Sequence, residues 1–172
     1  MSFPTVELRV VEIKTAVPAG AGVEAGMLRL QETADPGRYL RMIIGQPEAR
    51  AIQSAFYGMS MPRPSTWDLF ATTVDVLGGE LQQVVITAVE EGRHFFATLE
   101  FSVAGDTRVV PCRPSDAVAL ALRVEAARIL TFEEVMAAAG VPADGSVPAD
   151  GSAPAGGSVP AETGREETPE PG

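Results

Sequence analysis

Polar and apolar residues alternate along three stretches near the start of the chain, and each stretch predicts a strand with one buried face. The first covers residues 6–14, where the alternation changes phase after Val10 and so indicates a β-bulge. The second and third cover residues 27–31 and 39–44, and the turn-prone sequence of residues 34–37 joins them.

Helical spacing follows these strands. Residues 46–48 (Gln-Pro-Glu) form a typical helix start, and apolar residues then share one face until Gly58 ends the helix. Residues 65–68 (Ser-Thr-Trp-Asp) resemble a capping box with Asp in place of the usual Glu. The two glycines at 78–79 are expected to end this second helix.

The middle of the chain contains strands of two kinds. Residues 81–89 are apolar on both faces, as expected of a strand in the centre of a sheet. Residues 95–103 alternate and predict a half-exposed antiparallel strand, which turns into a further β-rich run at 107–112. A short strand at 128–130 and a helix over 131–140 are expected to follow.

Residues 113–122, RPSDAVALAL, predict a short helix that is apolar on nearly all sides. Such a helix must be buried on most sides, so we expect it to be central to the fold. Taken together, the elements predict an α+β fold, in which about four helices pack on a mostly antiparallel or mixed sheet.

Residues 141–164 repeat a hexapeptide (VPADGS, VPADGS, APAGGS, VPAETG) with almost no large apolar side chain. Repeats of this composition cannot bury the core that a β-helix needs. We therefore predict one domain at residues 1–140 and a disordered acidic tail, rich in Pro, Gly, Ala and Ser, at residues 141–172.

The formal net charge of −10 is shared equally between these two parts. The tail has six acids and one base (−5), and the domain has 17 acids and 12 bases (−5). An acidic domain lacks the basic surface that usually supports high-affinity binding of nucleic acid. A local basic patch is compatible with this charge, because 11 of the 12 bases are Arg, which binds phosphate in bidentate geometry.

Cys112 is the only cysteine in the sequence, which excludes a disulfide framework within the chain and a Cys-based zinc site. The only histidine, His94, lies on the polar face of its strand, without a recognisable Ser or Cys nucleophile. No apolar run reaches 18 residues, and the N-terminus lacks a basic leader region. We therefore expect a cytoplasmic protein without a membrane segment.

Two segments, residues 63–68 (RPSTWD) and 113–116 (RPSD), each place an Arg, a rigid Pro, a Ser and a carboxylate at a helix start. If the two starts converge, the carboxylates could hold Mg²⁺ or Mn²⁺, and the guanidinium and backbone N–H groups could bind a phosphate. This chemistry suits metal-assisted hydrolysis of a phosphodiester. The alternative is two ordinary capped helices whose Arg residues pair with the acids, since Ser and Asp are common at helix starts.

Three motifs, IIGQPEARAI, MPRPSTWDL and RPSDAVALAL, resemble the bifunctional nuclease domain family in their order and spacing. The resemblance covers residues 7–140 and implies a compact α+β domain, DNase and RNase activity, and self-association. The family's polar signature corresponds to Glu48, Arg63, Thr66, Asp68, Arg113, Ser115 and Asp116. In the family pattern His usually precedes the acid of the second motif, and Trp67 stands there in this chain.

We therefore expect a metal-dependent nuclease that acts on DNA and RNA with little sequence preference. The resemblance makes Asp68 and Asp116 the candidate metal ligands and catalytic groups, and Glu48 a third candidate carboxylate. The candidate substrate-binding residues are Arg63, Arg113, Ser115 and Thr66. No organic cofactor is expected, and a homo-oligomer is expected, in the first instance a dimer. The alternative, favoured by the net charge and by Trp67, is a non-catalytic oligomeric binding or regulatory module.

Overall fold

The computed structural model describes residues 4–16, 25–34, 37–59, 61–91 and 94–143. Within these ranges the chain forms four helices and one seven-stranded mixed sheet, which confirms the predicted α+β class. The strands are β1 (Thr5–Ala16), β2 (Ala25–Glu32), β3 (Tyr39–Gly45), β4 (Gly79–Glu90), β5 (His94–Val103), β6 (Asp106–Cys112) and β7 (Arg128–Phe132). The helices are α1 (Gln46–Phe56), α2 (Thr66–Val76), α3 (Pro114–Ala121) and α4 (Glu133–Ala139).

The strand order in the sheet is β3-β2-β1-β7-β4-β5-β6. Neighbouring strands are antiparallel except for the pair β4 and β7, which is parallel. The register of β1 against β2 shifts between Val10 and Glu12, which confirms the predicted bulge. Val84, Val85 and Ile86 of β4 are at most 3% exposed, as predicted for a strand in the centre of the sheet.

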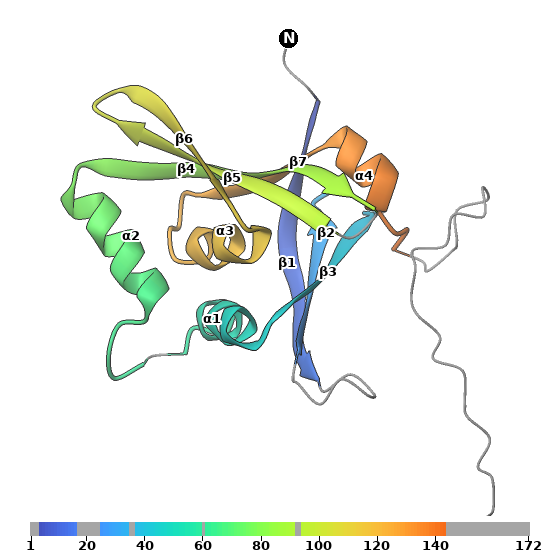
Figure 1. Cartoon of the computed structure of the whole chain (residues 1–172), viewed down its shortest axis with the longest axis horizontal. Coiled ribbons are helices and arrows are strands. Elements are labelled where there is room, and N and C mark those ends of the chain that lie inside the picture. The colour runs from blue at the N-terminus through green and yellow to red at the C-terminus, as the bar shows by residue number, and fades with distance from the viewer. Residues whose placement is uncertain (1–3, 17–24, 35–36, 60, 92–93, 144–172) are drawn as a thin grey trace, which may run out of the picture.

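The sheet curls, and Figure 1 shows α1 and α3 enclosed between the arm formed by β1, β2 and β3 and the arm formed by β4, β5 and β6. Residues 117–121 of α3 are at most 6% exposed, so the predicted central helix is buried on most sides. Figure 1 also places α2 and α4 at opposite ends of the molecule, with α2 below the far end of β4 and α4 beside β3, β4 and β7.

Helix α1 lies directly against strand β2 at Gly26. A Cβ atom added to this glycine would stand 2.4 Å from the Cβ of Ala49 and 2.9 Å from Cγ1 of Ile44. Separations this short are closer than van der Waals contact, so the position accepts no side chain unless the helix moves. The close contact sets the distance of α1, and therefore of Glu48 in its first turn, from the sheet.

An ion-pair network fastens α4 to the end of β2. The guanidinium group of Arg38 binds the Glu32 carboxylate (Nη2 to Oε1, 2.6 Å) and the Glu133 carboxylate (Nη1 to Oε1, 2.8 Å). These hydrogen bonds lower the pKa of both carboxyl groups, because Arg38 stabilises their charged forms, while desolvation opposes the shift.

The C-terminal end of the domain differs from the predicted boundaries. Thr131 and Phe132, expected to open the last helix, belong to β7, because Thr131 is fully buried and its Oγ1 donates to the Ile86 carbonyl (3.0 Å). The helix begins at Glu133. Val141, predicted to begin the tail, pairs with Tyr39, and residues 144–172 of the predicted tail lie outside the described residues.

Candidate active site

Helices α1 and α3 begin in the same way. Each has Pro in its first turn, a carboxylate three residues after the N-cap, and no hydrogen bond from a side chain at the cap. The carboxylates are Glu48 in α1 and Asp116 in α3, and an acid in this position is stabilised by the helix dipole. Both helices thus leave N-terminal backbone donors and a carboxylate at one end of the core.

Arg113, the N-cap of α3, joins these two carboxylates. Its Nε and Nη2 donate to Oδ2 and Oδ1 of Asp116 at 2.7 and 3.0 Å, and its Nη1 lies 2.8 Å from Oε1 of Glu48. The side chain of Arg113 is 66% exposed, whereas those of Glu48 and Asp116 are 12% and 27% exposed. The cation therefore lies on the solvent side of two partly buried carboxylates. Hydrogen bonding to Asp116 raises the pKa of Arg113.

The Glu48 carboxylate folds back over the residue that caps its own helix. A Cβ atom added to Gly45 would lie 2.3 Å from Oε2 of Glu48. The backbone of Gly45 has φ −65° and ψ 156°, which any residue can adopt, so glycine here provides space and no special conformation. The absence of a side chain at this position leaves the space that the carboxylate occupies where it binds Arg113.

A second cluster lies at the start of α2, where Ser65 and Asp68 form the predicted capping box. Oδ2 of Asp68 accepts from the Ser65 N–H and from its hydroxyl, both at 2.7 Å, and Asp68 N–H donates to Ser65 Oγ at 3.4 Å. The Asp68 pKa is lowered, mainly by the hydrogen bond from the Ser65 side chain and further by Arg123, while desolvation opposes the shift.

Arg123, which the sequence analysis did not identify, fixes this cluster to the core. Its Nε donates to Oδ1 of Asp68 at 2.5 Å, and its side chain is only 9% exposed. Its Nη groups donate to the carbonyls of Ala119 (2.6 Å) and Ala51 (3.2 Å) and to Ser54 Oγ (3.3 Å). The only sequence signal was a single cation directly after the apolar run of α3.

The two clusters lie at opposite ends of α3. Arg113 and Asp116 are at its N-terminal end, and Arg123 follows its C-terminal end. Arg123 follows Asp116 by seven positions in the chain, which corresponds to about 10 Å between their backbones along the axis of α3. Asp68 is held by Arg123, whereas Asp116 is bound by Arg113. The carboxylate brought to Asp116 is Glu48.

The remaining candidate residues have different surroundings. Ser115, a candidate for substrate binding and in the alternative a helix cap, is buried and makes no capping bond, because Arg113 is the N-cap and Ser115 lies inside the first turn. Thr66 is the exposed first residue of α2. Arg63 is exposed and lines a hollow of about 350 Å³ together with Asp68, beside Arg123.

Trp67, His94 and Cys112 have no contact that suggests catalysis. Trp67 packs partly buried against the core. The His94 ring lies 3.8 Å from the Glu91 carboxylate at the turn between β4 and β5, and its side chain is 68% exposed. Cys112 is half-buried, and burial raises the pKa of its thiol to about 11, which keeps it protonated near neutral pH.

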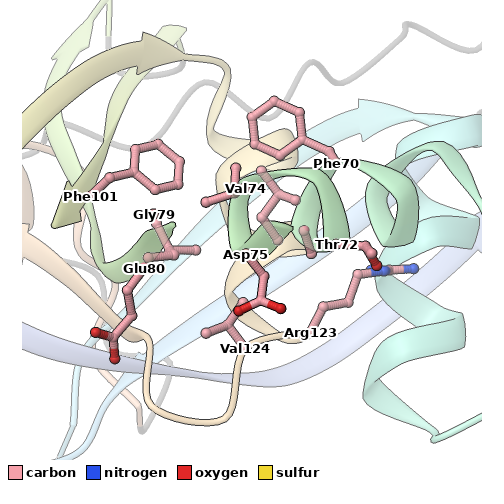
Figure 2. Close-up of a pocket in the computed structure, with 12 residues that line it drawn as sticks. Phe70, Thr72, Val74, Asp75, Gly79, Glu80, Phe101, Arg123 and Val124 are labelled. Carbon is pink, nitrogen blue, oxygen red and sulfur yellow. The ribbon is translucent and has the colours of Figure 1, made fainter. Parts of the chain in front are cut away.

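A second cavity, of about 320 Å³, lies beneath α2 (Figure 2). Its apolar wall includes Val74 and Phe101, and the carboxylates of Asp75 and Glu80 lie at its lower side in this view. Arg123 contributes its aliphatic stem, while its guanidinium group is turned away toward Asp68 and α1. This cavity therefore lacks the paired cation and carboxylates found at Arg113.

Within the described residues, no three His, Cys, Asp or Glu side chains are grouped closely enough to hold a metal between them. The Glu48 and Asp116 carboxylates, which share the partner Arg113, are oxygen groups of the kind by which Mg²⁺ is commonly bound beside a phosphate. No described helix has the length and apolar character needed to cross a membrane.

The chain is similar to known proteins over most of its length. Residues 28–144 match the bifunctional nuclease domain. Two relatives, named "Uncharacterized protein MT1877" and "Uncharacterized protein Rv1829", come from two strains of Mycobacterium tuberculosis. Each is 42% identical to this chain over 136 residues, which are 78% of this chain and 76% of the relative.

Proposed function

Because the chain belongs to the bifunctional nuclease domain family, we propose that it is a metal-dependent nuclease that hydrolyses phosphodiester bonds of DNA and RNA with little sequence preference. The observation that carries this proposal is the contact of the Glu48 and Asp116 carboxylates with one exposed guanidinium group, that of Arg113. Such a site contains both the oxygen ligands for a hard cation and the cation for a phosphate.

The proposed ligands of Mg²⁺ or Mn²⁺ are Glu48 and Asp116. In this structure the Arg113 guanidinium binds both carboxylates. A bound metal would lower the pKa of a water ligand and offset negative charge on the scissile phosphate. Arg113, two-thirds exposed, would then turn outward to hold a phosphate oxygen, a bidentate role that Lys could not fill.

Asp68 has a different part in this proposal. Both of its oxygens are committed, one to Ser65 and one to Arg123, so it orients α2 and is a positioning residue. Arg63 and Thr66 at the same helix start are proposed to contact the nucleic-acid backbone farther along the strand. No organic cofactor is part of the proposal, and the cytoplasm is the proposed location.

The test is cleavage of single-stranded DNA and RNA by highly purified protein with Mg²⁺, with Mn²⁺ and with EDTA. We expect metal-dependent cleavage that falls at least 100-fold in Asp116→Asn and Glu48→Gln. A matched control is Asp106→Asn, which removes an exposed carboxylate that is paired with Arg108 at a turn. Cleavage that survives in Asp116→Asn and Glu48→Gln but is lost in Asp68→Asn, with all proteins folded, would move the metal ligand to Asp68.

A second candidate is a non-catalytic oligomeric binding or regulatory module. The commitment of Glu48, Asp68 and Asp116 to Arg partners favours it, as does Trp67 in the place of the family's histidine. Absence of cleavage by the wild-type protein at every metal concentration, with no binding of Mn²⁺ detected by calorimetry, would establish this alternative.

A further inference from the structure

Cations gather on the outer face of the arm formed by β1, β2 and β3. Leu28 and Leu30 of β2 are fully buried on the inner face, which α1 covers, so Arg29 between them points to the outer face. Directly opposite residues of antiparallel strands share a face, and Arg29 is opposite both Glu12 and Arg41. We give the name cationic face to five residues that this register places on the same side: Arg9, Lys14, Arg29, Tyr39 and Arg41.

The three arginines of the cationic face have unused hydrogen-bond donors. Arg9 and Arg41 are exposed, and neither forms an ion pair within the described residues. The Arg29 guanidinium stacks on the Tyr39 ring, 3.7 Å from its centroid. Its buried Nε has no hydrogen-bond partner in the part of the chain that the structure describes. Each guanidinium group is therefore available to an anionic partner.

Acids are fewer than cations on this side of the arm. Glu12 pairs with Lys14, and Glu7 lies two residues before Arg9 at the border of the face. Four cations and two acids give this surface a charge of +2, whereas the domain as a whole carries −5 (17 acids, 12 bases). A cationic surface on an acidic domain attracts an anionic partner to that one place.

The chain leaves the domain at the edge of the cationic face. Figure 1 shows the end of α4 close to the start of β3. There the Val141 N–H donates to the Tyr39 carbonyl and the Tyr39 N–H donates to the Val141 carbonyl, both at 2.8 Å. The described residues end two positions later, at Ala143. Residues 144–172, which we call the acidic segment, therefore begin beside Tyr39.

The acidic segment carries the charge that the cationic face lacks. It contains six acids and one base, a net charge of −5, and four of the acids lie within residues 162–170. We propose that the acidic segment binds the cationic face of the same chain, with carboxylates of residues 162–170 on Arg9, Arg29 and Arg41. The segment then covers this surface against other polyanions.

The length of the acidic segment permits this contact. The cationic face extends about 13 Å along the strands and about 10 Å across them. Glu162 follows Ala143 by 19 positions, and a chain of that length spans at most about 65 Å. Individual exposed ion pairs are weak, but tethering gives the segment an effective concentration on the order of millimolar. Several weak pairs together can therefore hold it.

A separate polyanion fits the cationic face less well. Nucleic acid or an anionic membrane would have to displace a tethered segment of like charge and approach a chain of net charge −10. The acidic segment meets neither obstacle. Binding of a separate polyanion in its place is therefore an outcome that would contradict the proposal.

The test is paramagnetic relaxation enhancement in the full chain. A nitroxide is attached at Thr168→Cys in a Cys112→Ala background, because Cys112 is the only cysteine of the sequence. Amide signals of residues 27–31 and 39–43 should broaden, whereas those of β6, at the other edge of the sheet, should not. The broadening should disappear in about 0.5 M NaCl, because salt screens exposed ion pairs.

Charge variants locate the contact. Arg29→Gln/Arg41→Gln on the face and Glu166→Gln/Glu167→Gln in the acidic segment should each abolish the broadening. The second pair leaves the sequence of the domain unchanged, so it tests the contact even where the first pair lowers stability. The matched control is Arg108→Gln, which removes an exposed guanidinium group from β6 and should leave the broadening as in wild type.

A fluorescein-labelled oligothymidylate in EDTA tests the competing occupant. We expect tighter binding by Glu166→Gln/Glu167→Gln than by wild type, because the cationic face is uncovered. Equal binding by these two proteins, together with a loss of affinity in Arg29→Gln/Arg41→Gln, would assign the face to nucleic acid and overturn the proposal.

Two results of the relaxation experiment would also overturn the proposal. One is the absence of broadening in wild type at low salt. The other is broadening in a mixture of nitroxide-labelled protein without ¹⁵N and ¹⁵N-labelled protein without nitroxide, which would place the segment on a second copy. None of these measurements involves cleavage, so the outcome is independent of the proposed nuclease activity.

Discussion

Arg123 and Asp68, 55 residues apart in the chain, form an ion pair with 2.5 Å between Nε and Oδ1. The same guanidinium group donates to carbonyl groups of α1 and α3, so one buried side chain joins three helices. Arg123, which follows α3 in the chain, therefore fixes the start of α2 to α1 and α3.

Replacing Arg123 should destabilise the fold. Arg123→Met removes the partner of Asp68 and the side-chain donor to the Ala119 carbonyl, so we expect the free energy of unfolding to fall by about 1–3 kcal/mol. Urea denaturation monitored by circular dichroism measures this free energy. Arg108→Met, which breaks the exposed pair with Asp106, should cost less than about 1 kcal/mol. Equal losses in the two variants would show that burial of Arg123 does not determine its contribution.

Ser65→Ala removes the side-chain half of the capping box. A lost N-cap costs about 1 kcal/mol of stability, and this loss should appear as a lower urea midpoint with an unchanged slope. Because the Ser65 hydroxyl is the main cause of the lowered Asp68 pKa, that pKa should also rise toward its ordinary value. Carboxyl titration by NMR measures it, and an unchanged pKa would assign the shift to Arg123.

Acid should weaken the attachment of α4. Arg38 lowers the Glu32 carboxyl pKa in the folded state, so the folded protein binds fewer protons than the unfolded chain at this site. The stabilisation is present above the ordinary carboxyl pKa and is lost as the pH falls through the lowered folded value. Glu32→Gln should lower the free energy of unfolding by about 2–3 kcal/mol at pH 7, as expected for the loss of hydrogen bonds to a charged group. The decrease should be smaller at acid pH.

Urea midpoints from pH 7 down to pH 3 measure this dependence. Asp106→Asn serves as the comparison, because its carboxylate forms only an exposed ion pair. Its profile should run parallel to that of wild type, whereas the profile of Glu32→Gln should be flatter. Parallel profiles for all three proteins would show that the Glu32 pKa is not lowered by folding.

Gly26→Ala should separate α1 from β2. The added methyl group would overlap Ala49, and overpacking of this kind costs about 1–3 kcal/mol. The double variant Gly26→Ala/Ala49→Gly transfers the methyl group across the same gap and should recover part of the loss. The cost of glycine inside a helix, about 1 kcal/mol, limits that recovery. Thermal unfolding of Gly26→Ala, of Ala49→Gly and of the double variant gives the coupling free energy between the two positions.

Local chemistry made several elements predictable. The phase change after Val10, the Ser65–Asp68 capping box and the apolar run of α3 all act within a few residues, and the structure contains each of them. The predicted start of the last helix at Thr131 was wrong because a distant contact overrode the local pattern. A residue that suits a helix cap was instead drawn into β7 by a hydrogen bond to Ile86, 45 residues away.

The sequence by itself determined which residues could carry chemistry, because charge, capping preference and hydrophobic period belong to each segment alone. Only the tertiary structure decided which of them meet. The curled sheet packs α1 beside α3 and so gives Asp116 the neighbour Glu48, while Asp68, at the other end of α3, is bound by Arg123. Pairings across 55 or more residues depend on how helices pack on a sheet, and no local pattern encodes that distance.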